Sequence, residues 1–373
     1  MGGLQREVNG RSTTVVKFLA VGLALAAGIT PLPSTTVERW FSTGLYPTLQ
    51  RTVTPLSNVL PFAVLDLLAV AGCAAVVVTL VRAATTARRT RRVLPLVRVL
   101  GDLAFSAALV YLAFLVLWGL NYRRVPMTAR LVVETGAPAS QAVTELGVEA
   151  ATQLNGLHDE AHRAGWDERP SDSETFRAAF ASAQRALSDA PPAEPGRLKR
   201  TLFGPYFRWI SVDGMVNPFG LEVLANPDLL PFERPFVAAH EWSHLAGYAD
   251  EAEASFVGWL ACMRAGVATR YSGWLFLYGQ VHSELDDAGR ARLASVLGAG
   301  PRQDIDAILQ RLRRGQLPWL RTAGWQVYDQ YLKANRVEEG VRSYGAVVTL
   351  ILRARFEPGW VPVRRTPVQV SGS

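Results

Sequence analysis

Three long apolar runs occupy the first third of the chain, and charged and apolar residues alternate at helical spacing through most of the remainder. Each run contains at most one acidic residue and approaches the roughly 20 residues that a helix needs to cross the hydrocarbon core of a membrane. We predict three transmembrane helices, at about 15–37, 59–81 and 99–122. The first run follows basic residues and contains two prolines, so a cleaved signal peptide is the alternative for it.

The positions of the arginines predict the orientation of these helices. Six arginines lie between the second and third runs, at positions 82, 88, 89, 91, 92 and 98, whereas only Arg39 and Arg51 lie between the first and second. Loops rich in Lys and Arg stay in the cytoplasm. We therefore predict a multi-pass protein of the cytoplasmic (inner) membrane, with the lipid bilayer as a partner and everything after Tyr122 extracytoplasmic.

The charge distribution supports this division and excludes other classes of protein. The chain has 39 Lys and Arg against 32 Asp and Glu, a net charge of +7, and the whole surplus lies in residues 1–122. A nucleic-acid-binding protein would carry its surplus in a folded basic domain, so we predict no nucleic-acid partner. Two cysteines in 373 residues exclude a disulfide scaffold and a cysteine-based zinc finger. The sequence does not indicate an oligomeric state.

The region from 123 to 373 has the pattern of a water-soluble, mostly helical domain. Ser140–Gly165 repeats apolar residues every three or four positions, which predicts an amphipathic helix. Leu202–Val223 is rich in aromatic, Gly and Pro residues, which predicts short strands with a turn at Asp213-Gly214. From Pro235 onward the pattern is helical again. The fold class is therefore mainly α, with N-terminal transmembrane helices and a C-terminal α+β domain that contains a small sheet.

One motif in this region indicates a chemistry. His240-Glu241-Trp242-Ser243-His244 is an H-E-x-x-H pentapeptide, and in a helix its two histidines share one face, so both imidazoles can bind one Zn²⁺. Zinc activates a water molecule, and Glu241 is placed to act as the general base. Pro235 suits the first turn of this helix, and Gly247 suits its C-terminal end.

A catalytic zinc site needs a third protein ligand and one open position. Asp250 can cap a second helix just downstream, and Glu253 falls at its third position. We expect Glu253 to reach the two histidines as the third ligand, with Glu251 as the alternative ligand. The competing interpretation makes Glu253 the acid of a capping box. The acid that is not a ligand, together with Asp250, would then orient a ligand imidazole.

A second histidine pair, His158 and His162, has the same spacing but lacks a Glu directly after the first histidine. No third ligand follows it along the chain, so a solvated helix face is the preferred interpretation.

Several segments of the chain resemble the bacterial membrane-protein family called domain of unknown function 3810. The segments are Trp118–Arg124, Asn217–Glu222, Pro235–Gly247, Glu253–Phe256, Tyr328–Lys333 and Gly340–Tyr344. The resemblance covers roughly residues 55–355. The family is similar to the gluzincin metallopeptidases, which implies a zincin-like domain with His240, His244 and Glu253 as metal ligands and Glu241 as base.

The segment before the metal helix is the candidate for substrate binding. In zinc peptidases of this kind a strand beside the metal pairs with an extended peptide. Met215–Asn226 would be this strand, with Glu222 and Asn226 as polar contacts; an ordinary structural strand is the alternative. The developing oxyanion also needs a stabilising group. Tyr344 is the first choice among four candidates, the others being Arg342, Tyr331 and Tyr248.

The sequence therefore predicts a membrane-anchored zinc-dependent metallopeptidase that acts on a peptide or protein substrate, with Tyr344 assisting Glu241 in catalysis. Two alternatives remain open at this point. In one, zinc holds together a non-catalytic membrane scaffold. In the other, the protein is a zinc hydrolase of a non-peptide component of the cell envelope.

Overall fold

The protein is mainly helical, as predicted, and its two sheets are small. The structure, a computed structural model, describes residues 2–335 and 346–365, with side chains from Val15 onward. The helical elements are α1 (Gly2–Ile29), α2 (Ser34–Val37), η1 (Glu38–Leu45), α3 (Tyr46–Val59), α4 (Val64–Thr90), α5 (Leu94–Leu117), η2 (Gly119–Arg123), α6 (Met127–Arg130), α7 (Ser140–Ala164), η3 (Pro170–Asp172), α8 (Glu174–Leu187), α9 (Gly204–Ile210), α10 (Arg234–Leu245), α11 (Glu251–Met263), α12 (Val267–Glu284), α13 (Asp287–Val296), α14 (Ala299–Gly315), α15 (Pro318–Ala334) and α16 (Ala346–Arg353). The strands are β1 (Leu198–Lys199), β2 (Gly214–Asn217), β3 (Glu222–Ala225), β4 (Phe356–Glu357) and β5 (Val361–Pro362).

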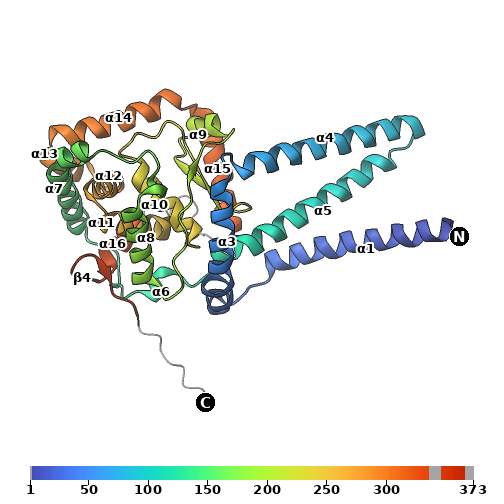
Figure 1. Cartoon of the computed structure of the whole chain (residues 1–373), viewed down its shortest axis with the longest axis horizontal. Coiled ribbons are helices and arrows are strands. Elements are labelled where there is room, and N and C mark those ends of the chain that lie inside the picture. Colours follow the sequence, from blue (N-terminus) through green and yellow to red (C-terminus); the bar gives the residue numbers. More distant parts are fainter. Residues whose placement is uncertain (1, 336–345, 366–373) are drawn as a thin grey trace, which may run out of the picture.

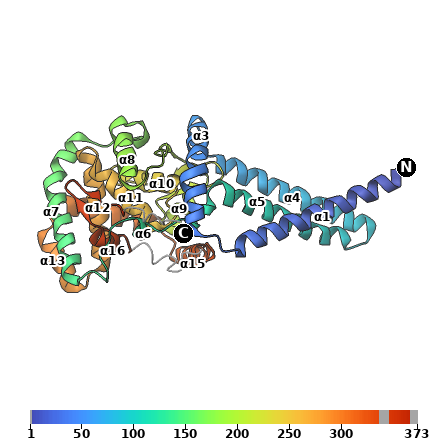
Figure 2. The ribbon, with the colours of Figure 1, turned by 90° about the horizontal axis from the view of Figure 1, so that it is seen from below.

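Helices α1, α4 and α5 project together from one side of a compact body (Figures 1 and 2). Within the described residues, α4 and α5 are long and apolar enough to cross a membrane, and their leucines and valines are largely exposed. Such a row of exposed aliphatic side chains suits a lipid environment and would be costly in water. The α4–α5 turn and the start of α1 lie at the same end, away from the body (Figure 1).

The helix boundaries differ from the predicted spans. The helix predicted over 15–37 is not continuous, because α1 ends at Ile29 and the segment Ser34–Val59 is bent by 113° relative to Val15–Ile29. The two segments together have the length and composition of one broken span. Pro31 and Pro33 explain the break, since proline lacks the N–H that would continue the helix. The other two spans are shifted to 64–90 and 94–117, so most of the arginines expected in a loop lie on the ends of helices.

Helix α3 crosses the base of the projecting helices and packs into the body (Figures 1 and 2). Tyr46, the first residue of α3, is fully buried, and its hydroxyl donates a hydrogen bond to the carbonyl oxygen of Leu245 at 2.8 Å. Farther along, Thr54 Oγ1 donates to the carbonyl oxygen of Leu221 at 2.7 Å. The packed body thus includes residues that precede the predicted domain boundary at Tyr122.

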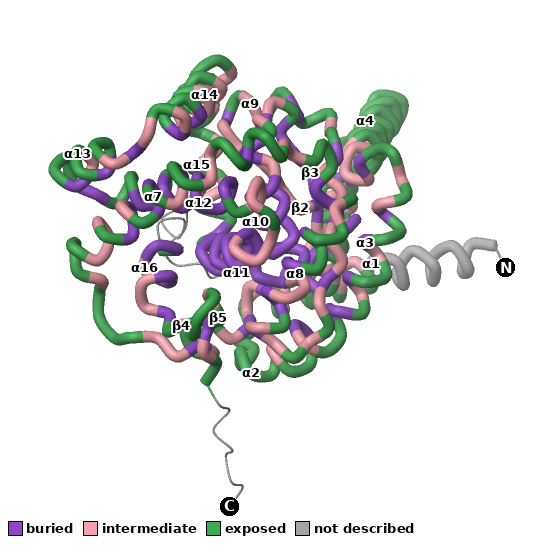
Figure 3. Tube along the Cα trace, turned by 60° about the vertical axis from the view of Figure 1, so that its left-hand side comes forward, coloured by how far each residue is buried: buried purple, intermediate pink, exposed green. Residues whose placement is uncertain are grey.

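The core of the body is centred on α10 and α11, which are buried along most of their length (Figure 3). Trp242 and Trp259 are among the largest fully buried side chains. Helix α8 packs on α11, and the predicted amphipathic helix, α7, packs along α12. The loop that joins α10 to α11 is itself largely enclosed, with Tyr248 and Ala249 buried.

The sheet beside α10 has the strand order β1-β3-β2, so β3 is its central strand and β2 lies at an edge. Strand β2 runs antiparallel to β3, with Met215 opposite Leu224. The expected turn at Asp213-Gly214 is wrong, because Gly214 begins β2 and the hairpin turns at residues 218–221. Asn217 stabilises the observed turn, since its side-chain oxygen accepts a hydrogen bond from the Phe219 amide.

Candidate metal centre

Helix α10 has the sequence signals of a well-defined start and end. Pro235 occupies its first turn, where the missing N–H costs nothing. Gly247 follows its C-terminus with φ +83°, a conformation that favours glycine, and a Cβ there would lie 3.0 Å from Asn121 Oδ1. The chain therefore turns sharply after His244 and returns as α11 against the same face of α10.

Three side chains from these two helices converge on one point. His240 Nε2 and His244 Nε2 are 3.2 Å apart, and Glu251 Oε2 lies 3.3 Å from the first and 3.4 Å from the second. Ligands at zinc bond lengths of about 2.0–2.1 Å in tetrahedral geometry are separated by about 3.3–3.4 Å. The residues therefore fit a zinc ion in both donor type and spacing.

The third member of this cluster is Glu251, the alternative ligand, and the prediction of Glu253 is corrected. Asp250 caps α11 by accepting the amide hydrogen of Glu253 at 3.0 Å, which puts Glu251 first and Glu253 third in the helix. Residues two positions apart in an α-helix are rotated by about 200° about the helix axis, so the two carboxylates point in opposite directions. Glu253 instead accepts a hydrogen bond from the Met127 amide and lies 3.7 Å from Arg130.

The imidazoles are oriented by groups that the sequence did not indicate. His244 Nδ1 donates to the carbonyl oxygen of Tyr248 at 2.7 Å, which leaves Nε2 available as a ligand. His240 Nδ1 lies 3.2 Å from Ser255 Oγ, one turn beyond Glu251 on α11. The expectation that acids orient the imidazoles is therefore wrong, because a backbone carbonyl and a hydroxyl contact their Nδ1 atoms instead. Tyr328, on α15, donates a hydrogen bond to Glu251 Oε1.

Two buried carboxylates dominate the electrostatics of the cluster. Burial raises the pKa of Glu241, and the two imidazoles offset this effect only in part. Burial alone would also raise the pKa of Glu251, but His244 and His240 hold it well below its usual range. His244 shows the reverse: burial alone would lower its pKa, whereas Glu251 and Glu241 raise it to about 9. The cluster therefore attracts positive charge, and a divalent cation would supply it while leaving the imidazoles neutral.

Two oxygen atoms at this point lack ordinary partners. Among the described residues, Oε2 of Glu241 and Oε2 of Glu251 are buried and make no hydrogen bond. Buried polar atoms without partners are rare in native proteins and indicate an ion or water. For Glu251 the missing partner fits a metal, since both imidazole nitrogens face the same oxygen. For Glu241 it fits a water molecule or a substrate.

A cavity of about 460 Å³ opens beside the cluster. Its walls include His240, Glu241 and Gly214, the first residue of the edge strand β2. Gly214 packs tightly against the carboxylate, since a Cβ there would lie 2.5 Å from Glu241 Oε1. The rest of the cavity wall is largely apolar, comprising Phe236, Leu275, Phe276, Ile308, Leu312 and Trp325 among others. The cavity thus reaches Glu241, with Gly214 of β2 packed directly beside its carboxylate.

The two predicted substrate contacts do not line this cavity. Glu222 is fully buried on the central strand, where its carboxylate accepts hydrogen bonds from Lys199 at 2.8 Å and from the Val64 and Leu65 amides at 3.0 and 2.9 Å. The side chain of Asn226 donates to the carbonyl oxygen of Val212, just before β2, and accepts from the Asp228 amide. The polar atoms of both residues are thus held by the protein's own groups, and β3 is paired on both edges, so the unpaired edges of this sheet belong to β1 and β2.

The candidates for oxyanion stabilisation are only partly placed. Tyr344 and Arg342 lie outside the described residues. The ring of Tyr248 lies under Arg124 and Arg130, and only its carbonyl group contacts the cluster. Tyr331, whose pKa burial raises to about 12, stacks on Tyr328.

Comparison with known protein families shows to which family the chain belongs. Residues 41–352 match the family described as "Protein of unknown function (DUF3810)". The chain belongs to this family. The match confirms the family resemblance predicted from the sequence, and it includes α10, α11 and the cavity. Neither the curated proteins nor the solved structures contain a match to the chain. The resemblance to zinc metallopeptidases stays a prediction.

Proposed function

We propose that this protein is a membrane-anchored zinc-dependent hydrolase of the metallopeptidase type. The observation that carries the proposal is the convergence of His240, His244 and Glu251 at ligand spacing beside the unpaired, buried carboxylate of Glu241. This set of two imidazoles and one carboxylate is found in catalytic zinc sites. The cavity beside it supplies the space that a substrate needs.

Each residue of the cluster has a role that follows from its position. His240, His244 and Glu251 would hold the ion, and zinc in such a site supplies Lewis-acid chemistry at neutral pH. Glu241 Oε2 would take a proton from the attacking water and return it to the leaving amine. Its raised pKa brings it closer to the operating pH, which favours both transfers.

The edge strand β2 favours a peptide over a non-peptide substrate. Its outer edge is unpaired among the described strands, and it begins at Gly214, against Glu241. An extended peptide that added to this edge would pass in front of the carboxylate, with its backbone held by strand hydrogen bonds. The apolar cavity wall would then accept a hydrophobic side chain next to the bond that is cleaved.

A purely structural zinc site is less well supported. Structural sites are closed by four protein ligands, whereas within the described residues the cluster comprises three ligand atoms and borders a cavity. A general base would also have no purpose in a structural site.

The membrane helices would anchor the enzyme and also support its site. Trp118, just after α5, donates a hydrogen bond from Nε1 to the carbonyl oxygen of His244 at 2.9 Å. Tyr46 does the same for Leu245. The arginines near the α4–α5 turn would keep that turn in the cytoplasm, which places the body, with its cavity, outside the cytoplasmic membrane.

The test uses the full chain purified in detergent, with zinc content and peptide cleavage measured on the same sample. The probe is a peptide mixture from a digested bacterial proteome, with new termini counted by mass spectrometry. We expect Glu241→Gln to retain zinc and lose cleavage, and the matched control Glu253→Gln to retain both. Equal cleavage by Glu241→Gln and the wild type, or no cleavage by the zinc-loaded wild type, would contradict the proposal.

A further inference from the structure

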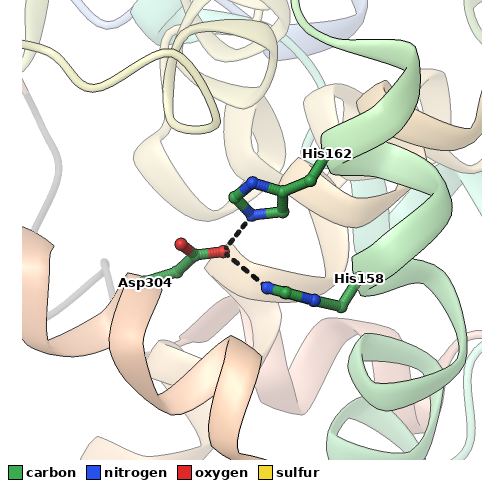
Figure 4. Close-up of side chains that lie close together, drawn as sticks. All are labelled: His158, His162 and Asp304. Atoms are coloured by element: carbon green, nitrogen blue, oxygen red, sulfur yellow. Dashed lines mark hydrogen bonds and ion pairs between the residues drawn. The ribbon is translucent and has the colours of Figure 1, made fainter.

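A second cluster of potential metal ligands lies where α7 meets α14. His158 and His162 project from one face of α7, and Asp304 reaches them from α14 (Figure 4). Asp304 Oδ2 lies 2.8 Å from His162 Nε2 and 3.8 Å from His158 Nε2. The expectation of a solvated helix face is corrected here, because Asp304, more than 140 positions away in the sequence, closes the cluster.

The surroundings of His158 hold its ring in place. Its Nδ1 lies 2.8 Å from Asp159 Oδ1, a carboxylate pairing that is common behind histidine ligands and that leaves Nε2 directed at Asp304. The ring also rests directly on Gly300 of α14, since a Cβ there would lie 2.4 Å from the imidazole. The glycine thus provides the space in which His158 can face Asp304.

A hydrogen-bond network alone does not account for both histidines. Asp304 Oδ2 already accepts a hydrogen bond from the Tyr271 hydroxyl at 2.5 Å and pairs with His162. A carboxylate has about four lone-pair sites over its two oxygens, so these two partners fill this oxygen. His158 Nε2 therefore faces an oxygen that has no lone pair left for it, at a distance too long for a hydrogen bond.

We propose that His158, His162 and Asp304 form a second binding site for a first-row divalent metal, of which Zn²⁺ is the leading candidate. Two imidazoles and one carboxylate suit Zn²⁺ and its transition-metal neighbours, whereas Mg²⁺ and Ca²⁺ prefer oxygen ligands. The two observed separations, 2.8 and 3.8 Å, lie on either side of the value of about 3.3 Å that zinc ligands require. An ion would replace the proton between His162 Nε2 and Asp304 Oδ2, and small side-chain rotations would bring both separations to that value. The histidine side chains are 20% and 38% exposed, so an ion can enter from solvent.

The metal at this site would fix a wall of the cavity described above. Ile308 and Leu312 line that cavity and lie one and two turns beyond Asp304 on α14. Arg311, on the same helix, forms ion pairs with Asp213 and Glu233 at the cavity rim. An ion that joins α14 to α7 would therefore hold these side chains in position. We assign the site a role in holding α14 against α7 and no chemistry of its own, because no acid stands directly after His158 as a free base in the way that Glu241 follows His240. With three protein ligands, a water molecule would complete the coordination.

The experiment measures the zinc stoichiometry of the full chain in detergent after chelation and reloading. The test variant is His158→Ala, which removes one ligand and leaves the hydrogen bonds among Tyr271, Asp304 and His162 intact. The matched control is His282→Ala, a histidine outside both clusters. We expect the control to bind one equivalent more than His158→Ala. Gly300→Ala keeps every ligand but displaces the ring, and we expect it to weaken the second equivalent by about tenfold or more.

The two clusters can be tested separately, because His244→Ala removes only the site on α10. We expect the His244→Ala variant to bind one equivalent of zinc and the double variant His244→Ala/His158→Ala to bind none. That result would establish the second site even if the first site proved not to bind zinc. Equal zinc content in His158→Ala and His282→Ala, both correctly folded by circular dichroism, would overturn the second site.

Discussion

Two helices of this protein each carry a pair of histidines four residues apart, joined by one carboxylate from another helix. The pair on α10 is nearly enclosed, with Glu251 3% exposed, whereas on α7 the side chain of His162 is 38% exposed. On α10 a glutamate follows the first histidine and faces a cavity; on α7 an aspartate follows and pairs with the imidazole itself. The same spacing therefore brings two imidazoles and a carboxylate together on both helices, whereas the neighbouring acid and the cavity distinguish the site that we propose to be catalytic.

The largest expected effect separates the two histidine pairs by activity. His244→Ala removes a ligand beside the general base, so we expect peptide cleavage to fall by about 10⁴-fold or more, since the metal and the base act together. His162→Ala removes a ligand from the second site, on α7, and we expect a fall of less than about tenfold. Cleavage rates of the two variants at equal protein concentration make the comparison. Similar losses in both would break the distinction.

The next largest effect compares the stability contributions of buried carboxylates with and without hydrogen-bond partners. Glu222 has partners for its oxygens, whereas Glu241 and Glu251 each have an oxygen without one. We expect Glu222→Gln to lower the free energy of unfolding by about 3 kcal/mol at neutral pH, because it leaves the buried ammonium of Lys199 without its charge partner. Glu241→Gln should change it by less than about 1 kcal/mol. Chemical denaturation in detergent measures both values.

The same carboxylate predicts a dependence on pH. Burial alone would raise the pKa of Glu222, but Lys199, Asn217 and two backbone amides hold it below its usual value. A carboxyl whose pKa is lower in the folded state stabilises the fold above its unfolded pKa of about 4.3, and the contribution is lost as the pH falls through the folded pKa. The stability difference between wild type and Glu222→Gln should therefore shrink below pH 4. A difference that stayed constant down to pH 2 would contradict the lowered pKa.

A smaller effect tests the contact between β2 and Glu241. Gly214→Ala adds a Cβ that would meet the Glu241 carboxylate, so the side chain or the strand must move. We expect cleavage to fall by about 10²-fold with zinc content unchanged, because misplacement of a catalytic group by about 1 Å has effects of this size. Gly279→Ala is the control, since nothing lies within 4 Å of a Cβ at that cavity residue.

The smallest effect tests the support of the third ligand. Tyr328→Phe removes the hydroxyl that donates to Glu251 Oε1. Loss of such outer partners lowers metal affinity by about 10–100-fold, and we expect the lower end for a single hydroxyl. Competition with a chelator measures the affinity. An unchanged affinity would show that α11 alone holds Glu251 in place.

The sequence predicted the parts of the site that depend on local structure. The spacing of His240 and His244 and the signals at Pro235 and Gly247 are properties of one helix, and α10 has the predicted form. Choosing between Glu251 and Glu253 required the register of α11 relative to α10, which depends on how the buried helices pack. Both acids lie in the first turn, and the sequence favoured Glu253 although the packing brings Glu251 to the histidines.

Long-range contacts explain the remaining differences. Asp304 reaches His162 across 142 positions, and Glu222 bonds to amides 158 and 157 positions away at the start of α4. Nothing in the local sequence marks either residue as a partner. Of the short strands predicted in Leu202–Val223, only those from Gly214 onward are present, because Gly204–Ile210 forms helix α9. Which strand would be central depended on β1, a two-residue strand without a pattern of its own.

The most direct test of the account is the position of the metal itself. An experimental structure of the full chain loaded with zinc, with anomalous scattering collected on both sides of the zinc absorption edge, would locate each bound ion. The account predicts a peak about 2.0–2.2 Å from His240 Nε2, His244 Nε2 and a carboxylate oxygen of Glu251, with the fourth position open toward the cavity. No peak at this point, or a peak closed by a fourth protein ligand, would contradict it.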